Sequence, residues 1–444
     1  MKTFIQDSHF EQAIRSLQRV VAVPSYLQDA VPGAPFGQDI LNCLKEGLTI
    51  FEEEGFSTYI DPDGYYGYAE IGEGKETFGI LCHLDVVPAG DLNLWKSPAF
   101  EGTIIDNNIV GRGVQDDKGP TIAALYSVKA LLEAGVTFNK KIRFIFGTDE
   151  ENLWRCMEEY HKKEQPVDIG IAPDANFPVI YAEKGLLQVY LTGEGSTDFT
   201  LQGGSALNVV ADSATYSGDK LEAATKQIDQ LNYAYEVKNN QLVVKGRSIH
   251  SKDAPDGVNA NTRLAEVLTT LYDHSGLDFL GNLVKDDALG ISVLGDLKDE
   301  ASGHLTFNTA TIDISETETK IGIDMRIPVT IDKDLVVEKL TASAKEYGLI
   351  YHEHDYLAPL YVPVDSELVT TLLGAYRDIT GDMREPQISG GATYARTMKN
   401  CVAFGAMFEQ TKDTMHQANE TWPLNEMRQT MEIYAEAIYR LCGK

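Results

Sequence analysis

Largely apolar runs of strand length alternate with amphipathic segments in the first part of the chain. Phe78–Cys82 and Ile142–Phe146 have the length and composition of buried strands, and Ile169–Ala172 is a further candidate. Between the first two, Gly119–Ala134 repeats its apolar residues at helical spacing and is followed by Gly135, a common helix stop. Strands that alternate with helices predict an α/β fold, with a mixed sheet covered by helices on both faces.

After residue 185 the pattern changes to strand-like stretches separated by polar turns. Leu187–Leu191, Leu242–Lys245 and Lys320–Arg326 are predicted strands, and Asn261–Tyr272 is a predicted helix. The stretch 186–363 has the size of a domain in its own right. We therefore expect an inserted α+β lid domain over residues 186–363.

The α/β pattern returns near the C-terminal end. A helix is predicted over Ser366–Ile379, a Gly-rich turn at Ser389-Gly390-Gly391, a strand over Val402–Phe408 and a closing helix after Pro423. A chain of 444 residues also exceeds the size at which one core stops growing. We expect residues 1–185 and 364–444 to form one discontinuous catalytic domain.

The chain is strongly acidic. Its 38 basic and 67 acidic residues give a formal charge of −29, which repels phosphate backbones and anionic lipid, so neither nucleic-acid nor membrane partners are expected. The first residues lack the apolar core of a secretory signal, and no apolar run is long enough to span a bilayer. The five cysteines are widely spaced and odd in number, which favours a reducing, cytoplasmic compartment.

Carboxylates and imidazoles stand near the ends of the predicted strands, where α/β sheets collect their ligands. His83 and Asp85 lie two residues apart on an extended segment, so one could ligate a metal while the other hydrogen-bonds its imidazole. In the pair Glu150-Glu151, one glutamate could hold a metal while its neighbour takes a proton from water. The other candidates are Asp116-Asp117, Asp174 and His416. Together they predict a two-metal hydrolase site.

Each motif taken alone has a simpler explanation. Asp116-Asp117 precedes a predicted helix and could cap it, whereas Glu150-Glu151 could be a solvated acidic loop. His352-x-His354 is interpreted as part of a surface strand, since no similar acidic motif surrounds it. His250 lies in a compact loop and could be hydrogen-bonded locally. Only the complete set favours a catalytic function.

The segments HLDVVPAG, GRGVQDDKG, DEEN, PDANFP and HQANE resemble, in order, the signature of the co-catalytic metallopeptidases related to aminoacylase and glutamate carboxypeptidase. LWKSPAFEG, DEENLWRCM and SGGATYAR resemble the bacterial dipeptidase V branch, the Xaa-His or carnosinase-like dipeptidases. The resemblance implies a phosphorylase/hydrolase-like catalytic fold with a lid. One departure is Asn152-Leu153-Trp154, where the family often has a small residue and then glycine; it would reshape the pocket wall.

The resemblance also implies roles for the candidate residues. Asp116 would bridge two metal ions, with His83 and Asp174 completing one site and Glu151 and His416 the other. The Asp116–Asp117 peptide bond would be cis.

Further residues acquire catalytic or binding roles by the same resemblance. Asp85 would orient the imidazole of His83, Glu150 would be the general base, and His250 would stabilise the oxyanion. The residues that would contact the substrate, with Arg326 directed to its carboxylate, are Asn208, Arg326, Gly390, Gly391 and Arg396.

The resemblance implies that the protein is a monomeric metal-dependent dipeptidase. It would use two divalent ions, Zn²⁺ or Mn²⁺, with Co²⁺ as a further option. Its substrate would be a small unblocked peptide, because a long lid would close the site within one chain. Two alternatives remain open. One is a deacylase or desuccinylase of N-acyl amino acids from the same superfamily, and the other is a non-catalytic metal-binding relative. Glu150 argues against the second, since a pure binding site needs no proton shuttle.

Overall fold

A computed structural model describes residues 3–444 and divides into two compact units. The first comprises the chain up to Tyr181 together with Tyr361–Gln387 and Thr393–Lys444. The second comprises Ala182–Leu360 and Ile388–Ala392. The unit boundaries lie within a few residues of the expected ones, but the sequence did not predict that Ile388–Ala392 belongs with the second unit. Two contacts of this segment lie within the second unit: the Ser389 carbonyl accepts a hydrogen bond from the Lys184 amide at 3.0 Å, and the Gly390 carbonyl accepts one from Arg326 at 2.9 Å.

A mixed sheet forms the centre of the first unit, as the apolar runs predicted. Its strand order is β1-β2-β6-β3-β7-β22-β9-β20, with β21 paired to β9. Strands β6, β3, β7 and β22 are parallel, whereas β1 and β2 are antiparallel to their neighbours. The bounds are β1 Ser57–Ile60, β2 Gly67–Ile71, β3 Thr77–His83, β6 Lys141–Gly147, β7 Ile169–Ala172, β9 Ile180–Glu183, β20 Leu360–Tyr361, β21 Gln387–Ser389 and β22 Cys401–Ala403.

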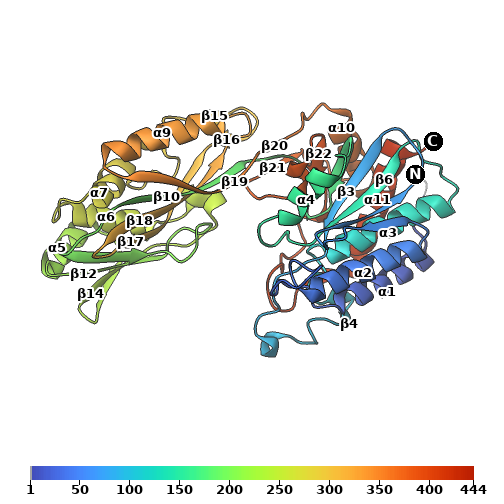
Figure 1. Ribbon diagram of the computed structural model, residues 1–444, viewed down its shortest axis with the longest axis horizontal. Coiled ribbons are helices and arrows are strands. Elements are labelled where there is room, and N and C mark those ends of the chain that lie inside the picture. The colour runs from blue at the N-terminus through green and yellow to red at the C-terminus, as the bar shows by residue number, and fades with distance from the viewer. Residues whose placement is uncertain (1–2) are drawn as a thin grey trace. The chain divides into compact units, whose positions relative to one another are not determined.

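Helices cover both faces of this sheet. On one face the ring of Phe51 in α2 packs against Phe144 and Phe146 of β6, with ring centroids 4.8 and 4.9 Å apart. Figure 1 shows α2 and α3 on this side of β3 and β6, and α4 on the other. The helices are α1 Asp7–Val21, α2 Gln38–Glu53, α3 Lys118–Glu133, α4 Arg155–Lys163, α10 Glu367–Thr380 and α11 Leu424–Cys442, with 3-10 turns η1 Leu92–Leu94 and η4 Tyr394–Thr397. Smaller strands are β4 Thr103–Ile105, β5 Asn108–Val110, β8 Ala175–Asn176, β23 Ala406–Met407 and β24 Thr421–Pro423.

The predicted strand Val402–Phe408 is wrong in one respect, because the chain changes sheets within it. β22 ends at Ala403, and β23 pairs with β8 instead of continuing the main sheet. Between them Gly405 has a φ of 73°, a left-handed conformation that interrupts an extended strand. The sequence does not reveal this break, because both short strands are buried and consist of apolar residues.

The second unit is an α+β domain built on an antiparallel sheet, in agreement with the expected fold class. Its strand order is β13-β14-β12-β11-β17-β18-β10-β19. Alternate residues of β10 (Leu187, Val189 and Leu191) enter a core with apolar residues of the helices that cover one sheet face (Figure 1). The strands are β10 Gly185–Glu194, β11 Phe199–Gly203, β12 Ser213–Gly218, β13 Tyr235–Lys238, β14 Gln241–Lys245, β15 Lys298–Asp299, β16 Gly303–His304, β17 Thr306–Ile314, β18 Glu318–Ile327 and β19 Ile350–Leu357. The helices are α5 Leu221–Leu231, η2 Ser251–Asp256, α6 Ala260–Thr269, α7 Ser275–Leu277, η3 Asp278–Val284, α8 Ile291–Leu294 and α9 Lys333–Glu346.

Two further expectations concern the surface. His352 and His354 are exposed on β19, as expected for a surface strand. Across residues 3–444, none of the helices combines the length and the apolar character needed to cross a bilayer.

Candidate metal centre

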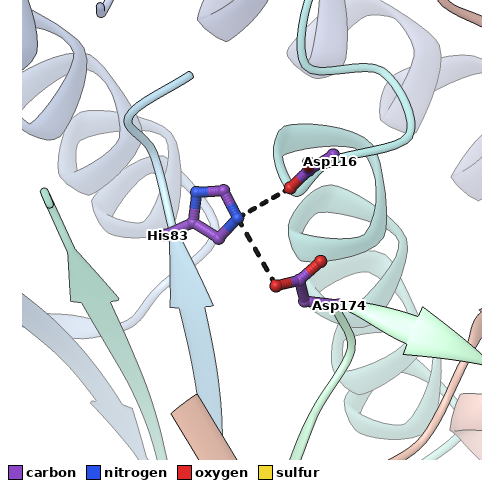
Figure 2. Close-up of side chains that lie close together, drawn as sticks. All are labelled: His83, Asp116 and Asp174. Atoms are coloured by element: carbon purple, nitrogen blue, oxygen red, sulfur yellow. Dashed lines mark hydrogen bonds and ion pairs between the residues drawn. The ribbon is translucent and has the colours of Figure 1, made fainter. Parts of the chain in front are cut away.

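His83, the last residue of β3, lies between two carboxylates. Its Nε2 is 2.9 Å from Oδ1 of Asp116 and 3.7 Å from Oδ2 of Asp174, as the dashed lines in Figure 2 show. Asp116 stands in the loop before α3, and Asp174 follows β7. All three side chains are largely shielded from solvent. The adjacent carboxyl ends of β3 and β7 therefore bring together three potential metal ligands.

The second oxygen of Asp116 belongs to another group of potential ligands. Asp116 Oδ2 is 2.9 Å from His416 Nε2, which is also 3.0 Å from Glu151 Oε2. In each group of three, the ligand atoms lie within 4.8 Å of one another. One carboxylate thus presents one oxygen to each group, the arrangement that a bridging ligand between two neighbouring cations requires.

The imidazole of His83 is held in the orientation that a ligand needs. Its Nδ1 donates to the backbone carbonyl of Asp85, 2.9 Å away, which leaves Nε2, the nitrogen that faces the carboxylates, as the one that could coordinate a metal. The Asp85 carboxylate was expected to orient the ring, but its Oδ1 is 3.6 Å away. Its Oδ2 instead accepts the backbone N–H of Glu151 at 3.1 Å. The Asp85 main chain therefore holds the His83 ring and its side chain holds the Glu151 amide, whereas an orienting role for the carboxylate, which lies within ion-pair distance of Nδ1, stays a prediction.

Asp117 directly follows Asp116 and supports the neighbouring strand end. The Asp116–Asp117 peptide bond is cis, as expected. The Asp117 side chain is fully buried, and its Oδ2 accepts the His83 amide at 3.2 Å and the Thr121 hydroxyl at 3.1 Å. Although Asp117 precedes α3, its side chain makes no capping hydrogen bond, so the helix-cap alternative does not describe it.

Glu420 anchors the loop that carries Asp116, and sequence reasoning overlooked it. Its buried carboxylate accepts the backbone N–H groups of Gly113, Gln115 and Asp116 at 3.0, 2.8 and 3.3 Å. It also accepts a charge-assisted hydrogen bond from Arg112 Nη1 at 2.7 Å. The available signal was its place in HQANE, four residues after His416.

The centre concentrates negative charge. Burial raises the pKa of Glu150 well above its usual range, and the nearby Asp174 charge raises it further. Burial and the Asp116 charge raise the pKa of Glu151 to about 7. Hydrogen bonding to Asp116 and Glu151 raises the pKa of His416 to about 11. Carboxylate oxygens and imidazole nitrogens in such a field are the donors that divalent cations prefer, so these residues fit a pair of metal ions.

The predicted residues of the second unit gather around Ser251. The backbone of Ser251 donates to the Asn208 carbonyl at 2.9 Å, and its hydroxyl donates to Asp324 Oδ1 at 2.8 Å. Arg326 Nη2 lies 3.1 Å from the same hydroxyl, and Arg326 Nη1 donates to the Gly390 carbonyl at 2.9 Å. His250 directly precedes this serine. Neither Ser251 nor Asp324 was singled out from the sequence, although Ser251 directly follows His250 and Asp324 lies two residues before Arg326.

Arg326 makes more internal contacts than its expected role implies. It is 3% exposed, and its Nε and Nη2 donate to the two carboxylate oxygens of Asp324 at 2.9 and 3.2 Å. Gln188 also donates to Asp324, at 2.8 Å. The guanidinium therefore supports the loop of His250, and its contact with a substrate carboxylate stays a prediction.

The two glycines and Arg396 differ in their surroundings. A β-carbon on Gly390 would lie 2.6 Å from Cβ of Lys252, so glycine permits this close approach. The Gly391 amide donates to the Ser389 hydroxyl at 2.9 Å. Arg396 is buried in η4 of the first unit. Their contacts with substrate stay predictions.

Comparison with known proteins agrees with this arrangement. The sequence model of peptidase family M20/M25/M40 matches residues 79–440. The "Putative dipeptidase YtjP" of Bacillus subtilis is 36% identical over 458 residues, covering 97% of each chain. The "Putative dipeptidase" of Staphylococcus epidermidis is 35% identical over 460 residues, again covering 97% of both.

Solved structures share the fold at low identity. Human carnosine dipeptidase 1 matches with a TM-score of 0.60 and 15% identity, covering 97% of this chain and 96% of that one. Aminoacylhistidine dipeptidase from Vibrio alginolyticus matches with a TM-score of 0.62 and 14% identity, covering 98% and 97%. With the family model spanning most of the sequence and full-length relatives above 30% identity, the chain belongs to peptidase family M20/M25/M40.

Proposed function

We propose that this protein is a metal-dependent dipeptidase that hydrolyses unblocked dipeptides. The observation that carries the proposal is the Asp116 carboxylate, whose two oxygens each lie 2.9 Å from a different histidine Nε2. The names of the full-length relatives from Bacillus subtilis and Staphylococcus epidermidis support the choice of dipeptides.

Five residues would hold the ions: Asp116 between them, His83 and Asp174 on one side, and Glu151 and His416 on the other. When bound, two such ions polarise the scissile carbonyl and acidify water. Zn²⁺ and Mn²⁺ suit this set of imidazole and carboxylate donors, and Co²⁺ is a third option.

Glu150 would be the general base. Its carboxylate belongs to neither group of ligands, yet it is adjacent in sequence to Glu151 and is influenced electrostatically by Asp174 and Asp116. A carboxylate beside the ions but outside their ligand sets can take a proton from the attacking water and return it to the leaving amine.

His250 would stabilise the oxyanion as a neutral donor. Its Nδ1 accepts the Lys252 amide at 3.1 Å, so the remaining ring proton sits on Nε2. Burial, together with the charges of Arg326 and Lys252, lowers the pKa of His250. The imidazole therefore stays neutral near pH 7 and offers one N–H to negative charge that develops on the carbonyl oxygen.

We propose a cytoplasmic location for the protein. The five cysteines are all buried and unpaired, which supports a reducing, cytoplasmic location. We also propose that the protein is a monomer.

The test is hydrolysis of a dipeptide library by chelator-stripped protein resupplied with one metal at a time. We expect turnover of unblocked dipeptides that depends on added Zn²⁺, Mn²⁺ or Co²⁺. N-acyl amino acids in the same assay provide the contrast. Turnover of these compounds without turnover of dipeptides would indicate a deacylase instead of a dipeptidase. Absence of hydrolysis with every metal would indicate that the protein is not a catalyst.

A further inference from the structure

The turn that carries the two glutamates is closed by interactions between its own residues. Asp149, which is fully buried, accepts hydrogen bonds from Arg155 Nε and Nη2, each at 2.7 Å. The Trp154 backbone amide donates to the Asp149 carbonyl at 3.0 Å. The turn is thus closed at residues 149 and 154–155, with Glu150 and Glu151 between them.

Trp154 holds the main chain of Glu150 directly. Its indole Nε1 donates to the Glu150 carbonyl at 2.8 Å. On the other side of the same peptide bond, the Glu151 amide donates to Asp85 Oδ2 at 3.1 Å. The Glu150–Glu151 peptide group is therefore fixed at both its oxygen and its nitrogen, which restricts where the Glu150 side chain can begin.

The backbone of Trp154 adopts an unfavourable conformation in this turn. Its φ of 58° and ψ of 21° are left-handed, an unfavourable conformation for a bulky residue. Such strained conformations persist when the surrounding structure over-determines them, and they cluster at active sites. Here the surroundings are a closed turn and a buried indole that is only 8% exposed.

Two edge-on ring contacts connect this indole with the candidate metal centre. Trp154 meets the Tyr394 ring edge-on, with centroids 5.2 Å apart, and Tyr394 meets His83 edge-on at 6.3 Å. The Tyr394 hydroxyl lies 3.0 Å from Cys156 Sγ. The ring lies so close to Gly147 that a β-carbon there would be 2.3 Å from Tyr394 Cε2. Trp154 therefore packs against a ring that is fixed in turn beside a metal-ligand histidine.

We infer that Trp154 is a positioning residue for Glu150. The inference rests on the proposed function, since it concerns the general base of that reaction. The indole N–H keeps the Glu150 carbonyl, and with it the carboxylate, in the orientation for proton transfer. This also gives a role to the tryptophan of the segment Asn152-Leu153-Trp154, in which the sequence departs from the pattern common in the family.

The decisive variant is Trp154→Phe, which keeps an aromatic ring against Tyr394 but removes the N–H. We expect kcat for a good dipeptide to fall about tenfold, the equivalent of one lost hydrogen bond, with KM and the number of bound ions unchanged. Trp95→Phe is the matched control, because its indole donates a similar bond, 2.9 Å to the Ala89 carbonyl, outside the turn. Trp95→Phe should retain kcat.

A double-mutant cycle with Glu150→Asp separates positioning from a structural role. If Trp154 acts through Glu150, removing the indole N–H costs much less once the base is already misplaced, so the two effects do not multiply. The inference would be overturned if Trp154→Phe kept the wild-type kcat, or if its loss of activity came from missing metal or a raised KM. It would also be overturned if the effects of the two substitutions on kcat multiplied. Lack of dipeptide hydrolysis by the wild-type protein would instead reject the proposed function, and the positioning role with it.

Discussion

The buried pair Arg112 and Glu420 allows a quantitative test of how the loop that carries Asp116 is supported. Glu420→Ala would leave the Arg112 guanidinium, whose side chain is 2% exposed, without the carboxylate 2.7 Å away. It would also remove the acceptor of three backbone N–H groups in the loop 113–116. Breaking a buried ion pair from one side costs about 3–5 kcal/mol, because the remaining charge is uncompensated.

The opposite substitution should cost less. In Arg112→Met the Glu420 carboxylate keeps its three backbone donors, so its charge stays hydrogen-bonded. Arg112 has fewer alternatives, since among residues 3–444 the other acceptor of its guanidinium is the Pro88 carbonyl at 3.3 Å. We therefore expect Glu420→Ala to destabilise the first unit more than Arg112→Met does.

Urea unfolding followed by tryptophan fluorescence measures this difference. The chain has three tryptophans, Trp95, Trp154 and Trp422, and all lie in the first unit, so the signal reports that unit. With a urea m-value of about 3 kcal/mol per molar, Glu420→Ala should lower the midpoint of chelator-treated protein by about 1–2 M. A shift below about 0.3 M, or an equal shift in Arg112→Met, would refute the reasoning.

Four further outcomes are expected. Glu150→Ala should lower kcat at least 1000-fold while both ions remain bound, as counted by elemental analysis; retained turnover would exclude Glu150 as the base. Stripping the ions should lower the melting temperature, because a ligand at 100 times its Kd adds about 2.7 kcal/mol to the free energy of unfolding; a calorimetric scan that chelator leaves unchanged would contradict metal binding by the folded protein. Asp324→Asn should reduce kcat/KM by at least tenfold, since it removes the charge that pairs with Arg326 and replaces one of two acceptor oxygens, all of whose partners are donors, with an NH2 group; unaltered kinetics would show that the His250 loop needs no such support. Phe51→Ala should cost about 3–5 kcal/mol in urea unfolding through the cavity it leaves beside β6, and a loss below about 1 kcal/mol would show that the ring cluster is loosely packed.

The local sequence pattern was sufficient to predict strands of the sheet that carries the candidate metal centre. The apolar runs at Phe78–Cys82 and Ile142–Phe146 predicted β3 and β6 to within a residue or so at each end. The spacing of His83 and Asp85 placed both near a strand end. These predictions succeeded because strand periodicity and helix termination depend on neighbours within a few residues, which the sequence displays directly.

Apart from what the family resemblance implied, only the tertiary structure decided which groups meet. A carboxylate in the sequence offers the same two oxygens whether it caps a helix, bridges two cations or anchors a loop, so Asp116, Asp117 and Glu420 are chemically alike until the fold places them. The break between β22 and β23 and the transfer of Ile388–Ala392 to the second unit likewise depend on distant partners. Such pairings are set by packing between segments up to about three hundred residues apart, and no local preference of the chain encodes them.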